Sequence, residues 1–249
     1  RDWFKLDGGG SFTVPANVAN ACAQGVLDGT EDVEGLKYNH NNRKYESQGV
    51  ELNFDVDFGA HQLALGGRVH RDEMDRFQPV EYYDQVDGEL LFRSLQRPTG
   101  SDNRREQAEA LSFWAVDSWR VSDALNLNLA LRYEDVDSWR KQYADPARTE
   151  LQSRRGNDTA EWLPGASLTY DLTDNWQLLA GVHRGFSPLG GGATENEDPE
   201  TSVNWEAIRR YSGSWFVEAI GFYSDFDNKT ENCSNASPCS NGATSGSFI

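Results

Sequence analysis

The side chains that usually carry catalysis are scattered along this sequence. Its four histidines stand in no serine or cysteine nucleophile motif; they are His40, His61, His70 and His183. Acidic pairs such as Asp55 and Asp57 are common, but 40 acidic residues in a chain of 249 make such pairs expected. We therefore predict a protein that is not an enzyme, with no cofactor and no resident metal site. A loop calcium stays open at "SDFDNKTEN" (224–232), which lacks the glycine of an EF-hand loop.

Two cysteines lie close together in the segment "ENCSNASPCSNG", which is rich in serine and asparagine. We predict that Cys233 and Cys239 form a disulfide that closes a small loop, which implies an oxidising compartment. The alternative is two free thiols. No histidine lies beside them, so a zinc site is not expected. Cys22 receives no role.

Composition excludes several classes of protein. The net charge of −17 argues against a nucleic-acid partner, which would need a basic surface. A hydrophobic content of 37% and the lack of any run of about 18 apolar residues argue against membrane-spanning helices. Neither observation excludes a transmembrane β-barrel, whose strands are only half apolar.

Alternation of apolar and polar residues dominates the chain. In "GVELNFDVDFGAHQLALGGRVH" (49–70) every second residue from Val50 to Phe58 is apolar. Such alternation predicts β-strands with one apolar face. We expect eight long strands, at Arg43–Phe58, Gln62–Glu73, Glu106–Trp119, Ala124–Val136, Glu161–Leu172, Asn175–Phe186, Ser202–Tyr211 and Ser214–Asp227. The last strand is apolar on both faces, so its orientation stays open.

The connections alternate between short and long. Short turns are expected at 59–61, 121–124, 172–175 and 212–214, and long loops near 74–105, 137–160, 187–201 and 228–245. Short periplasmic turns and long extracellular loops are typical of outer-membrane barrels. Aromatic residues near the short turns would form an interfacial girdle. We therefore predict an all-β fold, a meander of antiparallel transmembrane hairpins whose apolar faces contact lipid.

Three segments carry a more specific resemblance. "LSFWAVDSWRVSDALNLNLALRYEDV" (111–136), "WLPGASLTYDLTDNWQLLAGVHRGFSPLGGG" (162–192) and "PETSVNWEAIRRYSGSWFVEAIGFYSDFDN" (199–228) resemble, in this order, hairpins of TonB-dependent outer-membrane receptors. The resemblance covers roughly residues 43–249. Ile208 stands where the family pattern has glycine. The glycine-rich and two-cysteine loops look most like the ferric-citrate-type branch.

The resemblance implies a 22-stranded barrel with an N-terminal plug, of which this chain would be a middle portion. No plug, no TonB box and no terminal phenylalanine is recognisable in residues 1–249. The implied function is TonB-linked uptake of a ferric siderophore or a ferric citrate-like chelate across the bacterial outer membrane. The implied partners are the chelate, outer-membrane lipid and, through the plug, the TonB complex.

An anionic chelate would need guanidinium groups, because these bind carboxylates in a bidentate way. On the barrel interpretation, five residues are candidates for ligand binding: Arg68, His70, Arg76, Arg93 and Arg97. For each, the alternative is a solvated loop charge or a salt bridge. Two other interpretations of the whole chain stay open. They are a secreted soluble β-rich domain that binds or hydrolyses carbohydrate, and a complete small outer-membrane barrel.

Overall fold

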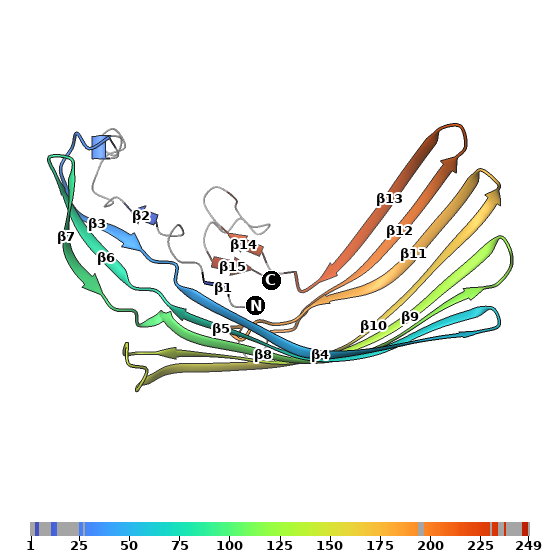
Figure 1. Cartoon of the computed structure of the whole chain (residues 1–249), viewed down its shortest axis with the longest axis horizontal. Helices are drawn as coiled ribbons and strands as arrows, with labels where there is room; N and C mark the ends of the chain where they lie inside the picture. Colours follow the sequence, from blue (N-terminus) through green and yellow to red (C-terminus); the bar gives the residue numbers. More distant parts are fainter. Residues whose placement is uncertain are drawn as a thin grey trace. The chain divides into compact units, whose positions relative to one another are not determined.

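The computed structural model describes residues 25–26, 28–193, 197–229 and 237 in full, and the backbone alone of 3–4, 11–13, 231–233 and 246–248. Strands make up most of this part of the chain (Figure 1). Their bounds are β1 (Trp3–Phe4), β2 (Ser11–Thr13), β3 (Val33–Asn39), β4 (Arg43–Phe58), β5 (His61–Phe77), β6 (Val80–Val86), β7 (Glu89–Gln96), β8 (Gly100–Arg120), β9 (Leu125–Tyr143), β10 (Leu151–Thr173), β11 (Trp176–Ser187), β12 (Glu200–Ser212), β13 (Phe216–Asp227), β14 (Glu231–Cys233) and β15 (Gly246–Phe248). Among the described residues there is no helix of the length and hydropathy needed to cross a membrane.

The strands form three sheets. The largest has the order β1-β4-β5-β8-β9-β10-β11-β12-β13, so from β8 onward each strand pairs with the next one in the sequence. A second sheet has the order β2-β3-β6-β7, and β14 pairs with β15. The fold is therefore the predicted all-β antiparallel meander, with two additional small sheets that the sequence did not suggest.

The chain forms two compact units. Unit 1 contains residues 1–48, 71–108 and 139–156, and unit 2 contains residues 49–70, 109–138 and 157–249. All five boundaries between the units fall inside long strands, namely β4, β5, β8, β9 and β10, so each of these strands contributes residues to both units.

All eight predicted strands are present, and five of them are longer than expected, β12 by three residues and the others by at least five. Residues 74–105, predicted as a long loop, hold the end of β5, the hairpin β6–β7 and the start of β8. Residues 137–160, also predicted as a loop, reduce to a connection at 144–150 between β9 and β10. The two loop predictions are wrong for different reasons. In residues 137–160 both strand faces are mostly polar, so the alternation disappears while the backbone ladder continues. In β6 and β7 apolar residues stand next to each other, so the alternation is broken although the strands are present.

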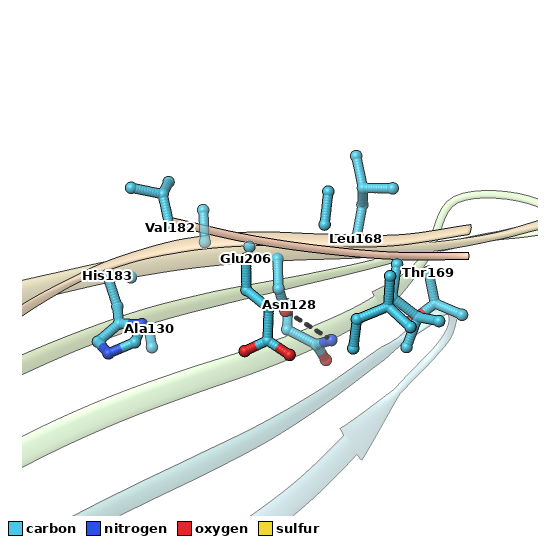
Figure 2. A pocket seen from close by; sticks show the side chains of 14 residues that line it. Asn128, Ala130, Leu168, Thr169, Val182, His183 and Glu206 are labelled. Carbon is cyan, nitrogen blue, oxygen red and sulfur yellow. Dashed lines mark hydrogen bonds between the residues drawn. The ribbon is translucent and has the colours of Figure 1, made fainter. Parts of the chain in front are cut away.

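The register in unit 2 separates two faces. Trp176 pairs with Tyr211, and Val182 pairs with Trp205, on one side of the sheet. We call this side the apolar face; the polar face carries Gln177, which pairs with Arg210. Figure 2 shows Val182 and Leu168 on one side of the sheet and His183, Glu206 and Asn128 on the other.

The register also orients β13, which the sequence left open. Val217 and Tyr223 pair with Tyr211 and Trp205, and therefore lie on the apolar face. Phe222 pairs with Glu206, which places this phenylalanine on the polar face with 82% of its surface exposed.

The apolar face is not packed into a core. Val50, Leu52, Phe54 and Val69 are 60–69% exposed. The described hydrophobic residues that are buried are few: Val26, Leu36, Ala110 and Val136. A soluble β domain would bury these strand faces. The exposed pattern instead fits strands that face lipid, as the sequence predicted.

Candidate functional site

Four arginines gather in unit 1, each from a different strand. Arg43 begins β4, Arg76 lies near the end of β5, Arg104 near the start of β8, and Arg140 near the end of β9. These strands are consecutive in the sheet order, so residues at the same level of neighbouring strands meet. We call this group the arginine cluster.

Two carboxylates hold the arginine cluster together. Arg76 Nη2 lies 2.7 Å from Asp102 Oδ1. Glu106 Oε1 accepts from Arg140 Nε at 2.6 Å, and Arg104 Nε lies 2.7 Å from the same oxygen. Asp102, Arg104 and Glu106 are alternate residues of β8 and share one strand face. Because two carboxylates face four guanidinium groups, the cluster keeps an excess of positive charge.

Several donors of the arginine cluster have no acceptor. The Nε atoms of Arg43 and Arg76 are buried without a hydrogen-bond partner among the described residues. The Arg104 side chain is only 16% exposed. Burial lowers the pKa of Arg104 below its usual range; Glu106 opposes this effect, whereas Arg140, Arg76 and Arg43 add to it. Buried donors that lack acceptors are costly, and an incoming anion would satisfy them.

A cavity of about 270 Å³ opens beside the arginine cluster. Arg43, Arg76 and Asp102 line it together with amide groups, of which Gln78 donates to Asn41 Oδ1 at 2.5 Å. Guanidinium and amide donors around a cavity are the groups that would bind a carboxylate or another oxyanion. This geometry can bind and position a ligand, and it holds no nucleophile.

A different cluster lies on the other face of the same strands. Arg148 Nη1 and Nη2 donate to the two oxygens of Asp75 at 2.8 and 2.6 Å, and Arg148 Nε donates to Asn103 Oδ1 at 2.6 Å. Asn103 is fully buried and donates to the Asp145 carbonyl at 2.7 Å. Every strong donor here has an acceptor, so these residues fix the 144–150 turn and offer no site.

Unit 2 has a second polar hollow, on the polar face of β9 to β12. It encloses about 450 Å³, and Asn128, His183 and Glu206 point into it (Figure 2). Small residues make the space: Gly165 and Gly181 lie on this face, opposite His183 and Ser167. Asn128 Nδ2 donates to Ser167 Oγ at 3.3 Å. This hollow is less charged than the arginine cluster.

The five predicted ligand residues divide between the two units. Arg76 belongs to the arginine cluster of unit 1. Arg93 pairs with Asp84 at 3.1 Å and with Glu34 at 3.4 Å, as a surface salt bridge would. Arg97 is exposed after the end of β7. Arg68 and His70 lie in the part of β5 that belongs to unit 2.

Arg43 and Arg140 were missed, and Arg104 was assigned to a loop. The alternation of strand faces could have revealed such residues. Arg140, for example, continues the series of polar, even-numbered positions in "LNLNLALRYEDVDSWRK" beyond the apolar segment. The predicted disulfide lies outside the described residues, since Cys239 is not described and only the backbone of Cys233 is. In the described part of the chain no group of three or more histidine, cysteine or acidic side chains could hold a metal ion.

Comparison with known proteins gives one family and several similar folds. The family described as "TonB dependent receptor-like, beta-barrel" matches residues 2–247. The unliganded ferric citrate transporter FecA is 21% identical with a TM-score of 0.61, covering 80% of this chain and 30% of FecA. The ferric yersiniabactin uptake receptor FyuA from Yersinia pestis is 16% identical with a TM-score of 0.53, covering 77% and 30%. The copper transporter OprC is 15% identical with a TM-score of 0.57, covering 81% and 32%. The chain thus spans about a third of the length of these proteins.

Proposed function

Because the chain belongs to the TonB-dependent receptor family of outer-membrane β-barrels, we propose that it is part of a receptor for an anionic ferric chelate, such as ferric citrate or a carboxylate siderophore. The family consists of receptors and transporters of the outer membrane, so this location and a non-enzymatic role apply to the chain. The cargo and the residues that bind it are our proposal.

The arginine cluster is the observation that carries this proposal. The whole chain has a net charge of −17, yet four arginines gather around two carboxylates in unit 1. Keeping like charges together costs free energy unless an anion neutralises them. An anionic chelate supplies several carboxylate oxygens, which match the unsatisfied Nε–H groups of Arg43 and Arg76.

The alternation of side chains between the two strand faces supports a lumenal position for the arginine cluster. In β9, residues with odd numbers from Leu125 to Leu131 are apolar, and Arg140 has the opposite parity. In β8, Phe113 is apolar and odd, whereas Arg104 is even. Alternation along a regular strand therefore assigns both arginines to the side away from lipid, where a chelate that enters the barrel would meet them.

Transport would need parts of the full receptor other than the strands described above. We propose that the TonB complex supplies the energy for transport and acts through a plug. The long extracellular connections of the full receptor would guide the ligand into the barrel. Arg68, His70, Arg93 and Arg97 remain predictions for this role.

The test compares neighbouring arginines in the full-length receptor. We expect Arg104→Ala to weaken binding of ferric citrate about tenfold or more. Without Arg104, the Glu106 carboxylate competes with the chelate for Arg140. Arg105→Ala is the matched control, since Arg105 pairs with Asp75 on the opposite face. Binding is followed by quenching of tryptophan fluorescence during a titration with ferric citrate.

A neutral ferric hydroxamate serves as the comparison ligand. The proposal predicts that the hydroxamate binds weakly and that Arg104→Ala leaves its affinity unchanged. Equal losses in both variants, or strong binding of the neutral chelate alone, would contradict the assignment of an anionic cargo.

A further inference from the structure

The apolar face of unit 2 is interrupted by a hollow in its middle. Ala180 of β11 pairs with Ala207 of β12, and Ala207 pairs with Gly221 of β13, so three small residues stand in one row. Larger side chains border this row: Leu127, Leu129, Leu168, Val182, Trp205 and Tyr223. Together they enclose about 660 Å³ of open, nearly wholly apolar space, which we call the apolar groove.

A charged residue lies in the next row of the same face. Arg209 pairs with Leu178 on one side and with Ala219 on the other, two residues along β12 from Ala207. Its neighbour Arg210 has the opposite parity and pairs with Glu218 at 2.9 Å. Arg209 is exposed, and no carboxylate of the described residues lies within ion-pair distance of it.

Arg209 leans toward an aromatic cluster beside two short turns. Its guanidinium carbon lies 4.5 Å from the centre of the Trp176 ring. Trp176 contacts Tyr211 at 5.0 Å between ring centres, and Tyr211 contacts Trp215 at 4.8 Å. Such aromatic residues mark the level of lipid headgroups, and arginines extend their charge toward that level. The charge therefore lies at headgroup depth, while the apolar groove lies deeper in the apolar band.

We propose that Arg209 and the apolar groove form a binding site for one glycerophospholipid. The phosphate accepts hydrogen bonds from Arg209, and one acyl chain fills the apolar groove between Val182, Trp205 and Tyr223. Two features of the molecule select this occupant. The surface faces lipid, so its partner comes from the membrane. Arg209, two residues along β12 from Ala207 of the groove, carries a positive charge, so the partner carries an anionic group next to an apolar chain.

The experiment is native mass spectrometry of the full-length receptor in detergent, titrated with phosphatidylglycerol. We expect one lipid to bind more tightly than the rest. Diacylglycerol with the same acyl chains lacks the phosphate and should bind about tenfold more weakly. Arg209→Ala should weaken phosphatidylglycerol by a similar factor and leave diacylglycerol unchanged, which separates the headgroup contact from the acyl-chain contact.

Groove-filling variants test the second half of the site. Ala207→Trp should weaken both lipids, and Gly221→Leu serves as a second variant if the tryptophan prevents folding. Arg120→Ala, near another short turn, and Val50→Trp, elsewhere on the apolar strand faces, are the matched controls. Heat-modifiable gel mobility identifies the folded variants. Equal binding of the two lipids to the unaltered receptor, or controls that lose as much as Arg209→Ala and Ala207→Trp, would overturn the proposal.

Discussion

At the scale of single residues, Arg148 joins segments that lie far apart in the sequence. Its backbone has φ = 60°, a conformation that side chains other than glycine adopt at a cost of about 1 kcal/mol. The bidentate contact with Asp75 and the contact with Asn103 offset this cost. Arg148 also packs against Tyr143 and Phe77, with its guanidinium carbon 5.5 and 5.6 Å from their ring centres. The 144–150 turn is therefore an ordered element.

The ion pair between Asp75 and Arg148 should make stability depend on pH. Burial alone would raise the pKa of Asp75, but Arg148 and Arg105 outweigh this effect and hold the pKa below its ordinary value of 3.8. A carboxylate with a lowered pKa stabilises the fold above its unfolded value, and this contribution is lost as the pH falls through the folded value. Asp75→Asn should therefore lower stability at pH 7 by roughly 0.5–1 kcal/mol, a small effect because solvent screens the pair.

Melting temperatures of the full receptor and of Asp75→Asn check this between pH 7 and pH 3. The difference between the two proteins should shrink below pH 3.8. Asp158→Asn is the control, and it should show no such convergence. A difference that stays constant across the range would mean that the ion pair does not couple to folding.

Residue types alone did not reveal the arginine cluster. Of the five residues predicted to bind a ligand, Arg76 lies in this cluster, and a ligand-binding role for it stays a prediction. Arg43 and Arg140 stand 97 positions apart and meet only because of the sheet order. Arg93 has the right chemistry but nearby acidic partners in Asp84 and Glu34. A charge and its spacing cannot distinguish these cases without the register of the strands.

At the scale of elements, the hairpin β6–β7 shows what a local signal can reveal. Its turn is Asp87-Gly88, and both residues have positive φ, 50° and 79°. This is the type I′ conformation that Asp-Gly favours in two-residue hairpins. The segment was predicted as a loop, although the turn residues were present in the sequence, because neighbouring apolar residues in 90–92 and the pair Tyr82-Tyr83 break the strict alternation.

Gly88 should be the residue of this hairpin least tolerant of change. A side chain at φ 79° is strained, and its Cβ would lie 3.0 Å from the Gly29 carbonyl oxygen. We expect Gly88→Ala to destabilise the hairpin by about 1 kcal/mol and to speed amide exchange in 80–96 about fivefold. Gly190→Ala, which has no neighbour within 4 Å, should leave exchange unchanged.

Hydrogen exchange with mass spectrometry of the full receptor measures this effect. Exchange that is equally fast in both variants, or unchanged in both, would contradict a strained glycine at the turn.

The presence of strands in the apolar segments was predictable because one face meets lipid and the other does not. Strand length beyond them was not, because there the two faces meet similar surroundings.

At the scale of the whole molecule, the two faces of each strand differ in what they can tolerate. Phe54 is 62% exposed, and its neighbour Asn53 points to the other face, where it donates to Glu51 at 2.9 Å. Phe54→Arg should destabilise the receptor in a bilayer by about 2–4 kcal/mol, because a charge at the lipid face is costly. Asn53→Arg should cost less than about 1 kcal/mol, because it can pair with Glu51.

Denaturant titration of the full receptor in phospholipid vesicles measures both variants. Similar losses for Phe54→Arg and Asn53→Arg would show that the apolar strand face does not contact lipid. This prediction concerns the feature that the sequence specified best, since the alternation in residues 50–58 assigned these faces before any register was known.

The sheet order also has a kinetic consequence. From β8 to β13 each strand pairs with its successor, so most pairings close only a short stretch of chain and can form quickly, hairpin by hairpin. The pairing of β5 with β8 differs, because the β6–β7 segment intervenes. Loop closure costs more for a longer disordered chain. If β6 and β7 fold first through their Asp-Gly turn, they shorten the flexible part of that loop, and insertion into the membrane need not wait for a slow encounter of β5 with β8.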